Sequence, residues 1–121
     1  MENIKTESVF KEMLAQECAI AFIGFEWSGQ SKVSERLVES WEKNWLTQNG
    51  KVHSIYRISP DESPFTHSWI AENARNQTEG MEGGFGSVVW LRQGVMARYV
   101  RYAAQAGAEK LSAITQEVFG N

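Results

Sequence analysis

Two serine hydroxyls, Ser28 and Ser31, are the residues of this sequence whose type and spacing first suggest chemistry. They lie in the stretch WSGQSK, residues 27–32, where an apolar run is followed by a helical pattern. A serine at the start of a helix accepts a hydrogen bond from a free backbone N–H, and this cap is worth about 1 kcal/mol. The same place attracts anions, because a helix N-terminus presents N–H groups and partial positive charge. We expect capping as the main role of both serines, with anion or thiolate binding by Ser28 as the functional alternative.

The sequence offers no recognisable arrangement for hydrolysis or metal binding. His53 and His67 are the only histidines that could act as a general base, and no nucleophile-elbow motif accompanies them. We expect His67 to lie at the surface and His53 to be half-exposed. The two histidines and the single cysteine, Cys18, do not have the spacing of a metal site. The sequence therefore predicts no metal, no cofactor and no serine-hydrolase centre.

Cys18 is the one cysteine among 121 residues, so the chain cannot form an internal disulfide. It begins an apolar run, and we expect a small core residue there, with a redox handle as the alternative. The net charge of −3 and the scattered Lys and Arg argue against a nucleic-acid or membrane surface. The start of the chain lacks a signal-peptide layout, and no apolar stretch has membrane-spanning length. We expect a cytoplasmic protein.

A glycine-rich run, GMEGGFG, occupies residues 80–86. A phosphate-binding glycine loop leads from a strand into a helix. This run leads from a predicted helix into a predicted strand. We therefore expect a flexible connection here and no phosphate site.

Alternating helical and strand-like patterns predict one α/β domain over residues 1–121. The first strand–helix–strand unit implies a parallel pair with a right-handed crossover, and two later strands around a short turn imply an antiparallel hairpin. The fold class is a mixed sheet of about four or five strands with helices on both faces. The predicted elements are helix 6–17, strand 18–26, helix 31–48, strand 51–59, a helix opened by Ser63 and Pro64, strands 87–92 and 95–102, and a helix after Gly107.

The order of these elements, with WSGQSK at a strand–helix junction, resembles the thioredoxin-like family. Thioredoxins carry W-C-G-P-C-K at that place, so Ser28 and Ser31 stand where the family has its two cysteines, and Gln30 stands for the proline. The stretch 84–94, GFGSVVWLRQG, is similar to the family's second motif, G-I-P-T followed by an apolar strand and a turn. Gly86 then takes the place of the family's cis-proline. The resemblance covers roughly residues 5–120.

The departures from the family concern its redox chemistry. Dithiol exchange needs a thiolate at the helix N-terminus and a second thiol to resolve the mixed disulfide, and serine hydroxyls cannot replace either. Phe22 occupies the position of the family's buried aspartate. Replacement of the cysteines alone would not explain Phe22, Gln30 or Gly86. We therefore expect a redox-inactive member, with a trans bond between Phe85 and Gly86 because a non-proline cis bond costs about 2.5–4 kcal/mol.

The five tryptophans divide into two groups by position. Trp41, Trp45, Trp69 and Trp90 fit apolar faces and are expected in the core. Trp27 lies at the helix mouth, where the resemblance implies an exposed side chain that could anchor an interface. The resemblance also implies a groove for an extended peptide between the helix mouth and the glycine loop. Its expected residues are Trp27, Ser28, Gly29, Gln30, Ser31, Phe85, Gly86 and Ser87.

These observations favour a redox-inactive binding or adaptor protein whose partner is a protein or peptide, and neither nucleic acid nor a membrane. Two alternatives stay open. One is a thiol–disulfide oxidoreductase whose active-site cysteines were replaced by serine. The other is a binder of glutathione or small anions at the helix mouth, because some glutathione transferases use a serine there to stabilise the glutathione thiolate. The segment 59–84 is longer than its thioredoxin counterpart and lies near the expected groove.

Overall fold

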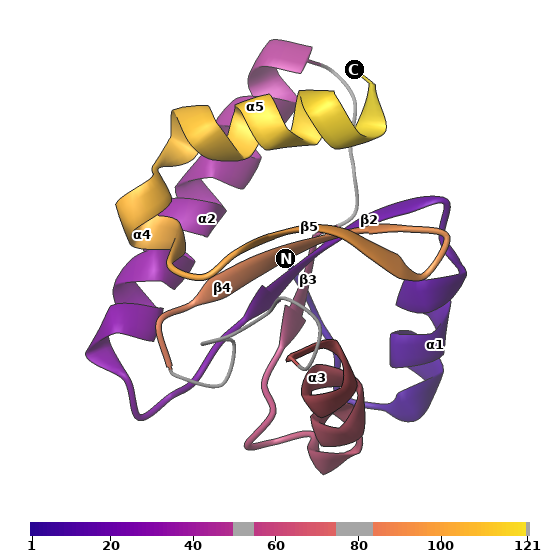
Figure 1. Ribbon diagram of the computed structural model, residues 1–121. Coiled ribbons are helices and arrows are strands. Elements are labelled where there is room, and N and C mark those ends of the chain that lie inside the picture. Colours follow the sequence, from indigo (N-terminus) through magenta and orange to yellow (C-terminus); the bar gives the residue numbers. More distant parts are fainter. Residues whose placement is uncertain (50–54, 75–83, 121) are drawn as a thin grey trace.

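The computed structural model describes residues 1–49, 55–74 and 84–120 of the chain (Figure 1). Its strands are β1 (Glu2–Asn3), β2 (Cys18–Ile23), β3 (Ile55–Ile58), β4 (Ser87–Arg92) and β5 (Val95–Val100). Its helices are α1 (Glu7–Ala15), α2 (Gly29–Asn49), the 3-10 turn η1 (Pro64–Thr66), α3 (His67–Ala74), α4 (Ala103–Ala106) and α5 (Ala108–Phe119). The α/β fold class predicted from the sequence is confirmed.

The strands form one mixed sheet with the order β1-β3-β2-β4-β5. β2 pairs in parallel with β3, with α2 as the connection between them, and it pairs antiparallel with β4. β4 and β5 form the predicted antiparallel hairpin. The central position of β2 explains its apolar run, because both of its faces are covered. The edge strand β1 has two residues and pairs with β3, and no residue pattern in the sequence predicted it.

Helices cover both faces of the sheet. In Figure 1, α2, α4 and α5 lie above it, whereas α1 and α3 lie below it. Alternate residues of β2 supply the two cores: Ala19, Ala21 and Ile23 pack with α1 and α3, whereas Ile20 and Phe22 pack with α2 and α5. β2 is therefore held between two packed layers, and the loop that follows it begins at the end of this buried strand.

Three of the four tryptophans that were expected in the core are buried, namely Trp41, Trp45 and Trp90. Trp90 also donates a hydrogen bond from Nε1 to Thr115 Oγ1 at 2.9 Å. Trp69 is only partly buried and meets Phe10 edge-on, with ring centroids 5.8 Å apart. Trp69 therefore packs on the margin of the lower core.

Several element boundaries differ from the predicted ones. α2 begins two residues earlier than expected, and the first strand ends at Ile23, before the predicted position 26. Thr6 caps α1, since Thr6 Oγ1 accepts a hydrogen bond from Val9 N at 3.2 Å. Ser63 precedes the 3-10 turn without capping it, because its hydroxyl donates to Ile4 O at 3.0 Å. Residues 51–54 of the predicted second strand lie outside the described ranges.

Cys18 does not have the fully buried position that was expected for it. It is the first residue of β2 and is only partly buried, whereas the five residues after it are fully buried. It pairs with Arg92, the exposed last residue of β4. The prediction of a core cysteine was wrong because the core begins one residue later, at Ala19.

Candidate functional site

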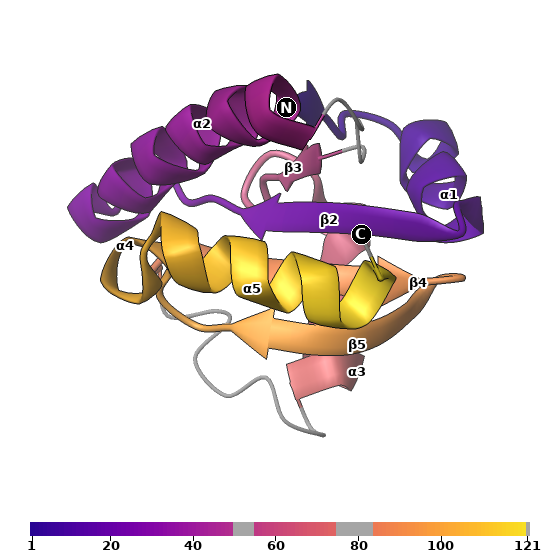
Figure 2. The same ribbon diagram turned by 90° about the horizontal axis from the view of Figure 1, so that it is seen from above.

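The loop between β2 and α2 brings the WSGQSK stretch to one end of the sheet, next to the start of β4 (Figure 2). Ser28 caps α2 as predicted, since its Oγ accepts a hydrogen bond from Ser31 N at 3.3 Å. Ser31 does not act as an N-cap but lies inside the first turn of α2, and its Oγ accepts a hydrogen bond from Phe25 N at 2.8 Å. Both serines are buried, so each hydroxyl holds the loop against the helix.

The hydroxyl of Ser28 also joins the helix mouth to the glycine loop. Its Oγ donates a hydrogen bond to the carbonyl oxygen of Gly84 at 2.5 Å. A serine hydroxyl has one hydrogen, and this bond uses it. A thiolate or other anion at Ser28 would have to displace Gly84 to gain that hydrogen. The geometry thus favours a structural role for Ser28 over anion binding.

Trp27 is 66% exposed, as the sequence predicted for this tryptophan. One part of its indole covers Gly84, where a Cβ would lie 2.5 Å from Trp27 Cη2. Its ring also contacts that of Phe25, with centroids 5.4 Å apart. The indole is therefore fixed on two sides, and its remaining surface faces solvent. A large apolar group held in place while exposed suits an interface anchor.

Gly86 packs its backbone directly on α2. Its φ is +86°, and a Cβ there would lie 2.4 Å from the Cβ of Ser34. The Phe85–Gly86 bond is trans, as predicted, since the described residues contain no cis peptide bond. Gly86 O accepts a hydrogen bond from Ala103 N at 3.0 Å. The glycine that stands in the cis-proline position thus allows helix and loop to touch.

Ser34 is a contact residue that sequence reasoning missed. Its side chain is fully buried, donates to Phe85 O at 2.8 Å and accepts from Ala104 N at 3.1 Å. Ser34 therefore links α2, the loop before β4 and the start of α4. A signal existed in the sequence, since Ser28, Ser31 and Ser34 recur every third residue and so fall near one face of α2.

Phe85 and Ser87 complete the other side of the site. Phe85 is partly buried, with the guanidinium carbon of Arg101 5.0 Å from its ring centroid. Ser87 is fully buried and donates from Oγ to Arg101 O at 2.8 Å. Tyr99 Oη lies 3.5 Å from Ser87 Oγ. Burial raises the pKa of Tyr99 above its usual value, against smaller lowering effects of the Ser87 hydrogen bond and the Arg101 charge.

The residues that were expected to form a groove divide into exposed and buried ones. Trp27, Gly29 and Gln30 are exposed, and Phe85 is partly exposed. The remaining four are buried, and Ser28 among them joins the two loops through its hydrogen bond to Gly84: Ser28, Ser31, Gly86 and Ser87.

Arg57 anchors the loop from the α2 side of β3, a role that the sequence did not indicate. Its guanidinium forms ion pairs with Glu35 at 2.8 Å and Glu26 at 2.9 Å, and it donates to Ser59 Oγ. These contacts join β3, α2 and the loop that carries Trp27. The site is therefore supported by elements on both sides of β2.

The other candidates from the sequence do not gather into a catalytic centre within the described ranges. His67 is exposed, as predicted, and its Nε2 lies 2.6 Å from Pro60 O. His53 and residues 80–83 of the glycine run lie outside these ranges. Among the described residues no three His, Cys, Asp or Glu side chains could hold a metal ion together.

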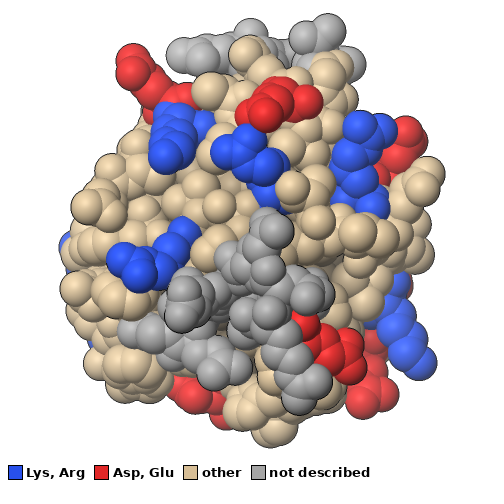
Figure 3. All heavy atoms as spheres, in the orientation of Figure 1, with Lys and Arg blue, Asp and Glu red and all other residues tan. Residues whose placement is uncertain are grey.

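The charged side chains do not form a single-sign patch on the visible face. In Figure 3, Lys and Arg are interspersed with Asp and Glu on the face turned to the viewer. None of the helices in the described part of the chain has the length and apolar character needed to cross a membrane.

Known structures show a close likeness in fold, whereas no family model and no curated protein sequence matches the chain. A thioredoxin from Malassezia sympodialis is 19% identical, with a TM-score of 0.66 over 97% of this chain and 89% of that one. A thioredoxin from Trypanosoma brucei brucei is 18% identical, with a TM-score of 0.64 over 94% and 89%. The oxidised thioredoxin from Plasmodium falciparum is 14% identical, with a TM-score of 0.64 over 97% and 96%.

The chain has the thioredoxin fold, which confirms the fold expected from its two motifs. Within this fold it carries Ser28-Gly29-Gln30-Ser31 at the junction of β2 and α2. Its single cysteine leaves it without a Cys-x-x-Cys pair.

Proposed function

We propose that this protein is a redox-inactive binding or adaptor protein that holds a protein or peptide partner at the exposed face of Trp27. The observation that carries this proposal is the indole of Trp27, 66% exposed yet fixed against Gly84 and Phe25. Pre-positioned aromatic side chains contribute much of the affinity of protein interfaces, because little side-chain freedom is lost on binding. The partner would lie across Trp27, Gly29, Gln30 and Phe85.

The absence of a dithiol supports binding over disulfide exchange. Cys18 stands at the start of β2, and the site follows the end of that strand, so the cysteine lies at the opposite end of the sheet. Ser28 and Ser31 use their hydroxyls in loop contacts. We further propose a cytoplasmic location, which fractionation of source cells with an antibody against this protein would test.

Capture of partners from source-cell lysate tests the binding function. Wild type, Trp27→Ala and Val95→Ala would be compared by mass spectrometry; Val95 is the matched control, since it is 69% exposed on the hairpin away from the site. We expect a stoichiometric partner with wild type and Val95→Ala and its loss with Trp27→Ala. A partner retained by Trp27→Ala would place the interface elsewhere, and no partner with any of the three would reject the adaptor function.

The alternative of an oxidoreductase whose cysteines were replaced is favoured by the thioredoxins among the similar structures. The double variant Ser28→Cys, Ser31→Cys separates the two functions. Because the buried Phe22 offers no carboxylate for proton transfer, we expect this variant to reduce insulin disulfides at least about tenfold more slowly than a thioredoxin. Activity equal to that of a thioredoxin would favour the oxidoreductase.

A further inference from the structure

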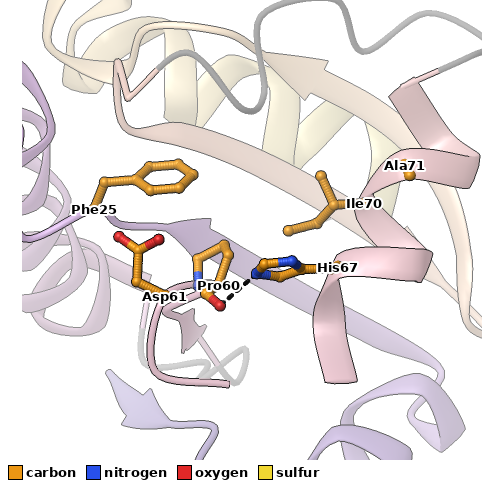
Figure 4. Close-up of a pocket in the computed structure, with 6 residues that line it drawn as sticks. All are labelled: Phe25, Pro60, Asp61, His67, Ile70 and Ala71. Atoms are coloured by element: carbon orange, nitrogen blue, oxygen red, sulfur yellow. Dashed lines mark hydrogen bonds between the residues drawn. The ribbon is translucent and has the colours of Figure 1, made fainter. Parts of the chain in front are cut away.

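A cavity of about 390 Å³ opens beside the site, on the lower side of the sheet. The described residues that line it are Phe25, Pro60, Asp61, His67, Ile70 and Ala71. Figure 4 shows Phe25 and Asp61 on one side, Ile70 and His67 on the other, and Pro60 between them. None of the sequence motifs pointed to this cavity, because its walls come from the β2–α2 loop, the loop after β3 and α3.

Three acceptor groups belong to the residues that line this cavity: the Pro60 carbonyl, the His67 ring and the Asp61 carboxylate. The carbonyl oxygen of Pro60 can only accept, so His67 Nε2, 2.6 Å away, must donate to it. In the neutral imidazole this leaves His67 Nδ1 as an acceptor. Asp61 adds an exposed carboxylate that has no ion-pair partner among the described residues. None of the described lining residues supplies a cation to pair with this carboxylate.

The apolar part of the cavity wall favours a ligand with a hydrocarbon chain. Phe25 and Ile70 are almost fully buried, and Ala71 leaves room at the rim. A group with a carbon chain and a terminal cation satisfies both parts, since the chain contacts Phe25 and Ile70 while the cation meets Asp61. A cation near Phe25 also gains from the negative face of the aromatic ring. An anionic group would be repelled by Asp61.

We propose that this cavity binds the basic side chain of a bound peptide, arginine in the first place, whose planar guanidinium carries five donors. The cavity adjoins the Trp27 surface, because the Phe25 ring forms its wall and contacts the Trp27 ring at 5.4 Å. A peptide that covers Trp27 can therefore place a neighbouring side chain in the cavity. The choice of a peptide as the source of the cation rests on the proposed function, whereas the binding of the cation does not.

A titration of the whole protein followed by NMR tests the cavity without any partner. The probes are Nα-acetyl-arginine amide and its uncharged analogue, Nα-acetyl-citrulline amide. We expect saturable shifts at Phe25, Asp61 and His67 with the arginine probe and about fivefold weaker binding of the citrulline probe. Equal binding of the two probes, or no saturable shift at these residues, would overturn the proposal.

Two variants and one control keep this test specific. Asp61→Asn should weaken the arginine probe about fivefold, whereas Glu62→Gln, an exposed neighbour outside the cavity wall, should not. Ala71→Leu should block both probes, because a larger side chain at this exposed helix position fills the rim. An arginine affinity unchanged in Asp61→Asn and in Ala71→Leu would contradict binding in this cavity.

The same variants distinguish the cavity from the adaptor function. Suppose that Trp27→Ala still captures the partner and that the arginine probe still binds the cavity saturably. The proposed function would then be contradicted, whereas the cation site would be supported. If the probe binds but Asp61→Asn leaves the affinity for a Trp27-dependent partner unchanged, the cation is a free small molecule, and the peptide source is overturned. We expect Asp61→Asn to weaken both the probe and the partner.

Discussion

At the residue scale, Gly86 shows how closely the site is packed. Its φ is +86°, and a Cβ at this position would lie only 2.4 Å from Ser34 Cβ, which leaves no room for a side chain. We expect Gly86→Ala to lower the free energy of unfolding by about 2–4 kcal/mol, through backbone strain and overpacking together. Urea unfolding measures this change.

Gly29→Ala is the matched control for this prediction. A Cβ at Gly29 meets nothing within 4 Å, and the residue lies in the first turn of α2. Alanine should therefore change the stability by less than about 1 kcal/mol, because it favours the helix. Equal losses in the two variants would contradict the close contact between the glycine loop and α2.

Tyr99 gives the protein a specific pH dependence at high pH. Burial raises the pKa of its phenol, so the folded protein retains this proton at pH values where the unfolded chain has lost it. The contribution of Tyr99 to stability is thus fully present below the unfolded pKa of about 10 and is lost as the pH rises through the folded value. Tyr99→Phe should flatten the fall in urea midpoint between about pH 9 and pH 11. An identical profile for wild type and variant would contradict this origin.

At the scale of elements, hydroxyl groups on α2 join it to the segment before β4. Ser28 and Ser34 each donate to a carbonyl of that segment, on Gly84 and Phe85 respectively. Removal of either hydroxyl takes a hydrogen bond from a buried or partly buried carbonyl, and Ser28→Ala also loses the helix cap. We expect each alanine variant to lose about 1–3 kcal/mol of stability.

The exposed Ser40 on the same helix supplies the control for these two variants. Ser40→Ala should remain within about 0.5 kcal/mol of wild type in urea unfolding. If Ser28→Ala and Ser34→Ala were as stable as Ser40→Ala, the two hydrogen bonds would not hold the segment in solution.

The spacing of apolar residues was enough to predict which helices and strands exist. It did not predict the contacts between them. The spacing of Leu37, Trp41 and Trp45 predicted α2, because an apolar stripe at helical period must face a core. Ser63 looked like a helix cap and instead reaches Ile4, which no local pattern could indicate. Cys18 looked like a core residue because the apolar run starts there, but it is the end residue of its strand and is only partly buried.

At the scale of the whole molecule, the order of elements and two degenerate motifs were enough to predict the thioredoxin fold. They also placed Trp27 at the surface, since the junction of β2 and α2 has a fixed place in this topology. The recurring serines placed Ser34 on the same helix face as Ser28 and Ser31, but its partners, the role of Arg57 and the cavity beside Phe25 could not be predicted. They depend on side chains from distant segments that meet only in three dimensions.

The affinity of the captured partner for wild type and Trp27→Ala, measured by calorimetry with Val95→Ala as control, tests the adaptor function most directly. A fixed and exposed indole at the centre of an interface contributes about 2 kcal/mol or more. We therefore predict an affinity at least about thirtyfold lower for Trp27→Ala and unchanged for Val95→Ala. Equal affinities of wild type and Trp27→Ala would contradict a partner site at the mouth of α2.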